Sequence, residues 1–341
     1  MYMIFLVLKD LQVRGMHLLK LCRTFSPTSR ELTRRVAALH TSTSESVEAK
    51  PLKFLTAAER KQYHDDGYIV VKDILSADEV EECRQALEEI KLSCGTDDSD
   101  IEKGIDGSIE RVRYPSRKHD VFLRLIHNSK LLDCVEDLFG TDSIRYIPQD
   151  KLNCKPAGGG AAIPWHQDWA HFPHTNDSVL TACLLLENTT RENGCLQIVP
   201  GSHKGPLFNH AIDGNFTGII TEPYYKPEKR VHLEATAGSV TFHHVRAVHG
   251  SAQNNSTFPR GTVCNIFTAM DAWPLLGVPP VDVPSWFNHA PVDYDQFVKS
   301  MVRGKPCSHP RMETNPVSLP IPFVTEYSVI TEYEFIIPPE P

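Results

Sequence analysis

The chain has 341 residues, of which 41% are hydrophobic and 23% charged, a composition typical of a folded globular protein. Its formal net charge of −8 disfavours a nucleic-acid binder and a protein of anionic membrane surfaces, because both classes present basic surfaces. Nine cysteines without a CxxC pair favour reduced intracellular thiols over a disulfide framework. No run approaches the roughly 20 apolar residues that span a bilayer, so no membrane span is expected.

Residues 1–50 are predicted to be a leader and linker. The stretch Met16–Ser44 is rich in arginine and serine and contains a single acid, Glu31. This composition is typical of a mitochondrial transit peptide, and an untargeted tail is the alternative. A cytoplasmic or peroxisomal location stays open, although the C-terminus carries no SKL address. Residues 51–341 are predicted to form one domain.

The first part of this domain is predicted to be mostly helical. Thr56 and Ser76 each begin a capping-box pattern, in which a glutamate follows three residues later. The predicted elements are a helix through Tyr63 that stops at Gly67, a strand at 68–71, a helix at 78–92, a loop at 95–107 and a helix at 121–139.

From Ile144 onward the sequence changes to short β-like runs separated by proline, glycine and asparagine. The predicted strands cover 179–186, 196–199, 231–235, 239–242 and 262–267. Runs of this length and spacing favour a sandwich or barrel. Beyond Ala272 we expect an irregular, proline-rich C-terminal cap with one helix at 294–302. The fold class is therefore expected to be mainly β with flanking helices.

His166 and Asp168 form an H-x-D pair, and a strand would place both side chains on one face. His249 is the best candidate for a third ligand, although His243 and His244 are possible rivals. Two imidazoles and one carboxylate on one side of a metal form the facial triad of non-heme Fe(II) oxygenases. Composition alone produces about two H-x-acid pairs. His64 and His232 begin two such pairs, but neither has matching sequence context.

Arg260 follows His249 by eleven residues and opens a predicted strand. A dicarboxylate that binds a metal at one end needs a cation at the other end. Arginine suits this role because its planar fork binds a carboxylate through two hydrogen bonds and keeps its charge when buried. If a strand pair holds His249 and Arg260, the arginine lies several ångströms deeper than the metal.

Several motifs together carry a resemblance to a known family. They are Trp165–Asp168, Glu192-Asn193-Gly194-Cys195-Leu196, Pro200-Gly201-Ser202-His203-Lys204, His249-Gly250-Ser251 and Arg260. Over roughly residues 52–275 the chain resembles the phytanoyl-CoA dioxygenase family. The resemblance implies a double-stranded β-helix (a cupin-like jelly roll) with Fe(II) on His166, Asp168 and His249. It also implies that Arg260 anchors 2-oxoglutarate.

The resemblance extends to the segment from Gln149 to Pro156. It implies that Asn153 contacts 2-oxoglutarate and that Gln149 contacts the cosubstrate or the substrate, and their even separation would turn both inward. Arg111 aligns loosely with a position at which the phytanoyl-CoA hydroxylase pattern has a lysine that contacts the cosubstrate. Cys183 replaces a tryptophan that contacts the cosubstrate in a family member, and this departure argues against phytanoyl-CoA itself as the substrate.

These features predict an Fe(II)- and 2-oxoglutarate-dependent dioxygenase, with ascorbate as a further candidate cofactor. It would use O₂ to hydroxylate an aliphatic C–H of a small organic or acyl substrate and release succinate and CO₂. Asp168 favours hydroxylation over halogenation, because related halogenases lack this carboxylate. The alternatives are a non-catalytic jelly-roll binding or scaffold protein and a zinc hydrolase on the same ligands.

The sequence encodes no readable substrate preference and no oligomeric state. Substrate choice is expected to depend on the irregular segments at 95–118, 205–230 and 272–320. His171 and His174 are candidates for the mouth of the substrate site.

Overall fold

The computed structural model describes residues 51–95, 98–213, 215–222, 227–275 and 294–314. The expected leader at 1–50 and much of the expected C-terminal cap lie outside these residues, so the division into a leader and one domain stays a prediction. In the described part of the chain, no helix is both long and apolar enough to cross a membrane.

Helices occupy the first part of the described chain, with one more near its end. They are α3 (Ala57–Asp66), α4 (Ala77–Ser93), α5 (Pro115–Lys118), α6 (Asp120–Ile126), α7 (Ser129–Phe139) and α8 (Tyr294–Lys299). Both predicted capping boxes are present, at Thr56 and at Ser76. The first helix stops at Gly67, whose φ of 83° is the left-handed conformation that favours glycine.

The larger of the two main sheets is antiparallel, with the strand order β1-β11-β6-β13-β4-β3-β2 and with β14 beside β4. Its strands are β1 (Tyr68–Val71), β2 (Ile101–Lys103), β3 (Ile109–Arg113), β4 (Ile144–Lys155), β6 (Val179–Leu185), β11 (Val240–His244), β13 (Arg260–Ala269) and β14 (Met301–Arg303).

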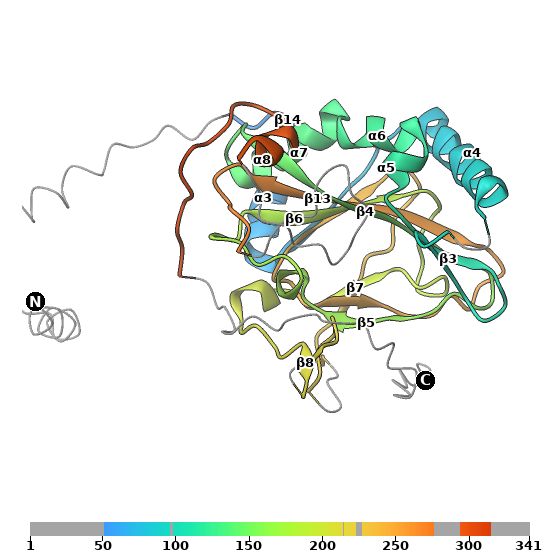
Figure 1. The fold of residues 1–341 in the computed structure, drawn as a ribbon. Coiled ribbons are helices and arrows are strands. Elements are labelled where there is room, and N and C mark those ends of the chain that lie inside the picture. Colours follow the sequence, from blue (N-terminus) through green and yellow to red (C-terminus); the bar gives the residue numbers. More distant parts are fainter. Residues whose placement is uncertain (1–50, 96–97, 214, 223–226, 276–293, 315–341) are drawn as a thin grey trace, which may run out of the picture. The chain divides into compact units, whose positions relative to one another are not determined.

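The smaller sheet has the order β10-β7-β12-β5. It consists of β5 (Ile163–His166), β7 (Leu196–Ile198), β10 (Val231–His232) and β12 (His249–Ser251), and a separate ribbon pairs β8 (Ala211–Ile212) with β9 (Asn215–Phe216). Figure 1 shows β5 and β7 on one side of the larger sheet and helices α4 to α7 on the other. These two facing antiparallel sheets confirm the expected jelly-roll class.

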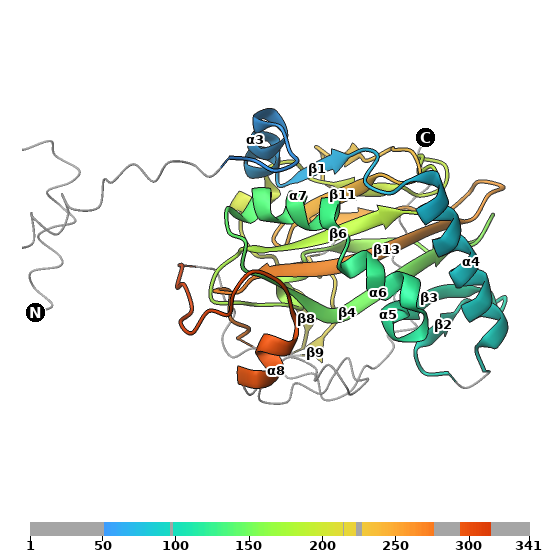
Figure 2. The ribbon, with the colours of Figure 1, turned by 90° about the horizontal axis from the view of Figure 1, so that it is seen from above.

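The two faces of the larger sheet differ in chemistry because successive side chains of a strand point to opposite faces. The outer face is apolar and packs with the helices into one buried cluster, which includes Phe242, Leu184 and Val263 from the sheet and Leu87 and Phe122 from the helices. Figure 2 shows these helices lying across β6, β13 and β4. The inner face, turned toward the smaller sheet, carries buried polar side chains and therefore holds the candidate site.

Four predicted elements differ from the structure. The expected strand at 231–235 is reduced to β10, Val231–His232. The expected loop at 95–107 contains strand β2, which pairs with β3. Its polar sequence lacks the apolar alternation from which a strand is predicted. The expected helix at 121–139 is two helices, because the first ends at Ile126 with His127 as its C-cap, and Asn128 caps α7 with its side chain. The expected helix at 294–302 stops at Lys299, and β14 follows and pairs with β4.

Candidate metal and cosubstrate site

Two paired strands of the smaller sheet bring the candidate histidine ligands together. His249 on β12 lies directly opposite His166 on β5, and their ring centroids are 4.1 Å apart. Asp168 Oδ1 lies 3.7 Å from His166 Nε2 and 3.8 Å from His249 Nε2. The ligand atoms of the three residues all lie within 4.8 Å of one another, so a single metal ion can contact all three.

The H-x-D pair does not lie on a single strand, contrary to the expectation. Strand β5 ends at His166, and Asp168 begins a short 3₁₀ turn, Asp168–Ala170. The intervening Gln167 is nevertheless extended, with φ −124° and ψ 125°, so the two ligands still point to the same side.

Backbone carbonyls orient both imidazoles. The Nδ1 atom of His166 donates to the Pro164 carbonyl at 2.8 Å, and that of His249 donates to the Ala247 carbonyl at 2.9 Å. These bonds fix the ring orientation and leave the Nε2 lone pairs directed at the centre of the site, as in metal-binding histidines generally.

Asp168 is held in place through its other oxygen. Oδ2 accepts hydrogen bonds from Thr181 Oγ1 at 2.6 Å and from His243 Nε2 at 3.2 Å. His243, a rival ligand in the sequence, therefore supports Asp168 instead, whereas His244 lies 3.7 Å from Asp177. Sequence reasoning missed both supporting roles, since only the strand register shows that Thr181 and His243 are neighbours.

The charge state of the three residues suits metal binding. Burial lowers the pKa of His249 to about 3 and holds the pKa of His166 well below its ordinary value. Burial alone would raise the pKa of Asp168, but its interactions with His249, with His243, which also donates a hydrogen bond, and with His166 bring it well below its ordinary value. Neutral imidazoles beside an ionised carboxylate are the forms that coordinate metals.

Arg260 lies across the interior, at the start of β13 in the larger sheet. Among the described residues β12 pairs with β5 and β7 and not with β13, so His249 and Arg260 do not lie on a strand pair. The guanidinium is buried and donates to Thr262 Oγ1 at 2.7 Å, to the Gly194 carbonyl at 2.6 Å and to the Asn193 carbonyl at 3.4 Å. Burial lowers its pKa. Within the described residues it makes no ion pair.

Gly194 explains part of the Glu192–Leu196 motif. Its φ of 71° is in the left-handed region, and an added Cβ would collide with the Ala252 carbonyl. This tight turn directs the Gly194 carbonyl at the Arg260 guanidinium.

The remaining predicted residues lie on β3 and β4. Asn153 Oδ1 accepts from Arg111 Nε at 3.0 Å, and Arg111 also pairs with Glu102 at 2.8 Å. Gln149 is buried and its Oε1 has no hydrogen-bond partner. A register shift interrupts β4 between Ile147 and Lys151, so even spacing alone does not fix the direction of Gln149.

Two further buried polar residues lie beside the ligands, and the sequence motifs that contain them did not reveal a role for either. Ser251 lies two residues after His249 on β12, and its buried hydroxyl has no hydrogen-bond partner. The Gln167 side chain is fully buried and bonds the Pro206 and Arg246 carbonyls and the Phe208 N–H, which ties the neighbouring loops to the H-x-D segment.

The two candidate mouth histidines have different surroundings. His171 donates to the Gly218 carbonyl at 3.2 Å, and its ring lies 6.3 Å from that of His166, so it borders the site. His174 is only 2% exposed and bonds the buried Arg145 at 2.8 Å, so the expectation that it lines a mouth is wrong.

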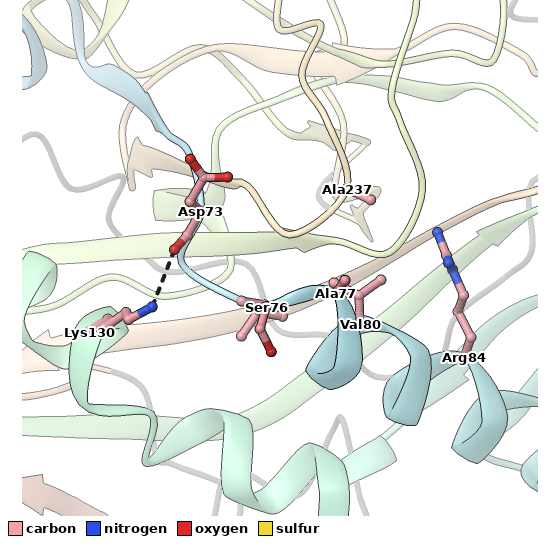
Figure 3. A pocket seen from close by; sticks show the side chains of 8 residues that line it. Asp73, Ser76, Ala77, Val80, Arg84, Lys130 and Ala237 are labelled. Carbon is pink, nitrogen blue, oxygen red and sulfur yellow. Dashed lines mark hydrogen bonds between the residues drawn. The ribbon is translucent and has the colours of Figure 1, made fainter.

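A separate pocket of about 450 Å³ opens beside the start of α4. Figure 3 shows its lining, including Ser76 and Arg84, with Lys130 donating to the Asp73 carbonyl at 3.4 Å. None of the predicted site residues lines it.

Comparisons with known proteins agree with this site. The model of a family described as "Phytanoyl-CoA dioxygenase (PhyH)" matches residues 63–262. A "Probable alpha-ketoglutarate-dependent hypophosphite dioxygenase" from Stutzerimonas stutzeri is 33% identical over 280 residues, which cover 78% of this chain and 92% of the relative. "Phytanoyl-CoA dioxygenase, peroxisomal" from Bos taurus is 29% identical over 239 residues, 63% of this chain and 69% of the relative.

A solved structure shares the architecture. EctD from S. alaskensis with bound Fe superposes with a TM-score of 0.56 at 25% sequence identity, and the match covers 68% of this chain and 83% of that one. The expected cofactors, iron and 2-oxoglutarate, are those of the chain's relatives.

Proposed function

Because the chain belongs to the phytanoyl-CoA dioxygenase family, we propose that it hydroxylates an aliphatic C–H bond of a small organic or acyl substrate. It is an Fe(II)- and 2-oxoglutarate-dependent dioxygenase. The reaction consumes the substrate, O₂ and 2-oxoglutarate and yields the hydroxylated substrate, succinate and CO₂, which balances. We assign the metal to His166, Asp168 and His249.

The observation that carries the proposal is the buried cluster of these three side chains. Two neutral imidazoles and one carboxylate on one side of a metal leave its other positions open for a chelating cosubstrate and O₂. A zinc hydrolase on the same ligands would leave Arg260 unexplained. A non-catalytic scaffold would need neither the intact triad nor the arginine.

Arg260 supports a dicarboxylate cosubstrate. A buried charge costs free energy unless it is paired, and Arg260 makes no ion pair with any described residue. Its hydrogen bonds use three of the five N–H groups that a guanidinium offers. The remaining N–H groups suit the distal carboxylate of 2-oxoglutarate. The unpaired Ser251 hydroxyl and Gln149 Oε1 are further polar atoms for a bound molecule.

When bound, Fe(II) and 2-oxoglutarate supply the oxidising power by activating O₂. The protein's own residues position and shield this chemistry. Thr181 and His243 hold Asp168 so that its free oxygen faces the two imidazoles. Behind Asp168, Trp169 and Phe172 belong to a buried apolar cluster that keeps water away from one side of the site.

The proposal is tested by offering the enzyme short carboxylic acids and acyl thioesters with Fe(II), 2-oxoglutarate and ¹⁸O₂. Hydroxylation predicts a product that gains one labelled oxygen and one succinate formed per product. In Arg260→Met we expect the Kd for 2-oxoglutarate to rise about 100-fold, because a buried charge partner is lost. The exposed Arg124→Met is the matched control. Product without label, or unchanged cosubstrate affinity in Arg260→Met, would contradict the proposal.

Lys151 favours a second candidate function, the oxidation of a small oxyanion. On the inner face of the larger sheet, Lys151 lies opposite Cys264, which lies opposite Cys183. The adjacent inward position on β6 is Thr181, which bonds Asp168. The partly buried Lys151 side chain therefore faces the site. Burial is the main cause of the low pKa of His249, and the positive charge of Lys151 lowers that pKa slightly further. The relative described as a probable hypophosphite dioxygenase is named after such an anion.

Phosphorus NMR separates the two candidates. Oxidation of hypophosphite to phosphite would use one O₂ and one 2-oxoglutarate per phosphite formed. Lys151→Met should then lower kcat/KM for hypophosphite about tenfold or more, which corresponds to about 1.4 kcal/mol. The exposed Lys103→Met on β2 is the control. If the wild-type enzyme forms no phosphite, this second candidate fails and the C–H substrates remain.

A further inference from the structure

We propose that Cys183 and Cys264 form an oxidation site, and that a disulfide between them closes the cosubstrate pocket to 2-oxoglutarate. The location of that pocket rests on the function proposed above.

The two thiols are already in contact. Cys183 on β6 and Cys264 on β13 are directly opposite each other, and their sulfur atoms are 3.0 Å apart. Opposite residues of antiparallel strands have Cα atoms about 4.5–5.5 Å apart, which lies within the range that a disulfide spans. A disulfide therefore needs a side-chain movement of about 1 Å and no new strand arrangement.

The strand register places this pair between the two ends of the candidate site. On β6, Thr181 is the next inward residue beside Cys183, and it bonds Asp168. On β13, Thr262 is the next inward residue beside Cys264, on the opposite side of the pair, and it bonds Arg260. A cosubstrate that reaches from the metal ligands to Arg260 must therefore cross the two sulfur atoms.

Other polar groups connect the pair to the same pocket. Asn153 Nδ2 lies 3.6 Å from Cys264 Sγ, and its Oδ1 accepts from Arg111. Lys151 lies opposite Cys264 on β4 and is partly exposed, whereas both thiols are buried. A small oxidant would therefore reach them through the space that admits the cosubstrate.

The pair is chemically asymmetric. Their mutual hydrogen bond is the main cause that lowers the pKa of the Cys264 thiol, and the same bond, with burial, raises the pKa of the Cys183 thiol. Thiolates, not thiols, are the reactive form. Cys264 is accordingly the attacking sulfur and Cys183 the resolving one.

Hydrogen peroxide is the oxidant class that fits this chemistry. The Cys264 thiolate attacks one peroxide oxygen, the O–O bond breaks, and the released hydroxide takes up a proton to form water. The resulting sulfenic acid reacts with the Cys183 thiol, the S–S bond forms, and a second water leaves. Two thiols and one peroxide thus give one disulfide and two waters. The disulfide draws Cys264 Sγ away from Asn153 and reshapes the floor between Asp168 and Arg260.

The test treats the full chain with stoichiometric peroxide and maps disulfides by mass spectrometry of non-reduced peptides. In parallel, calorimetry measures 2-oxoglutarate binding to the Mn(II)-loaded protein before oxidation, after oxidation and after reduction with dithiothreitol. We expect a Cys183–Cys264 peptide pair and an affinity loss of at least tenfold that dithiothreitol reverses. The affinity of Cys183→Ala for 2-oxoglutarate, whatever its value before oxidation, should not change on oxidation. Cys154→Ala, at a buried thiol on the outer face of β4, should respond like the wild type.

The outcomes separate the inference from the proposed function. If the reduced wild-type protein does not bind 2-oxoglutarate, the proposed function fails, and peptide mapping still decides whether the thiols pair. If peroxide leaves Cys183 and Cys264 unlinked, the oxidation site is overturned. If the disulfide forms and the affinity for 2-oxoglutarate does not change, the closure of the pocket is overturned.

Discussion

Asp168 depends on its neighbours more than either histidine of the triad does. Each imidazole is oriented by one nearby carbonyl of its own chain segment. The carboxylate instead depends on Thr181 and His243, which come from two strands of the opposite sheet. The precision of the metal site is therefore set partly by residues that never touch the metal.

Thr181→Val tests this positioning role because it removes the hydroxyl and keeps the side-chain shape. Partners of this kind typically contribute 10–100-fold to metal affinity. We expect anaerobic calorimetry to show Fe(II) binding weaker by about 10–100-fold. Thr181→Ser, which restores the hydroxyl, should recover most of this loss. Wild-type Fe(II) affinity in Thr181→Val would show that the hydrogen bond has no positioning role.

The sequence identified the residues that can be recognised from their own side-chain type and their local motif. His166, Asp168 and His249 combine ligand type with motif context, and the structure brings them together. Thr181 carries no such signal, His243 was only a rival ligand, and Ser251 lay within a motif without an assigned role, since the roles of all three arise from cross-strand register and from burial. Gln149 was predicted to point inward because its separation from Asn153 along the chain is even. A register shift in β4 interrupts the alternation of side chains between the two, so the spacing alone does not determine its direction.

At the scale of elements, local capping chemistry decides where helices begin and end. The apolar stripe of residues 121–139 continues through two helices, since both bury it against the same sheet. Asn128 nevertheless starts a new helix, because its side chain accepts from the Leu131 N–H at 3.1 Å. The periodicity of the apolar residues correctly predicted which face is buried. The Asn128 cap, which periodicity does not detect, determines where α7 begins.

Asn128→Ala should lower the free energy of unfolding by about 1 kcal/mol, the usual cost of losing an N-cap. Urea unfolding followed by circular dichroism measures this change. Ser129→Ala, at the exposed neighbouring position, should stay within about 0.5 kcal/mol of the wild type. Equal stabilities of Asn128→Ala and the wild type would show that the cap does not stabilise α7.

Strand pairing was the part of the fold that sequence could not supply. Only eleven residues separate His249 from Arg260, and the sequence left open whether their strands pair. The two strands belong to opposite sheets. This arrangement places the arginine and the metal ligands on facing walls of one interior, which suits a cosubstrate that spans the gap.

At the scale of the whole molecule, two sheets enclose a polar interior while helices seal the outer apolar face. One face of the larger sheet therefore stabilises the fold, and the other face carries the candidate site.

The leader expected at residues 1–50 lies outside the described residues and stays a proposal. Fusing residues 1–50 to a fluorescent protein tests it, with an Arg30→Glu, Arg34→Glu, Arg35→Glu fusion as control. Mitochondrial fluorescence that the control loses is expected, and diffuse fluorescence from both would contradict it.

The central claim is that His166, Asp168 and His249 hold the iron that drives 2-oxoglutarate turnover. The most direct measurement is succinate formation and O₂ consumption by anaerobically purified protein supplied with Fe(II), 2-oxoglutarate and ascorbate. His232→Ala is the matched control, because His232 begins an H-x-E pair outside the triad. We predict Fe(II)-dependent succinate formation in the wild type and in His232→Ala, and its loss in His166→Ala. Succinate formation at the wild-type rate in His166→Ala would contradict the account.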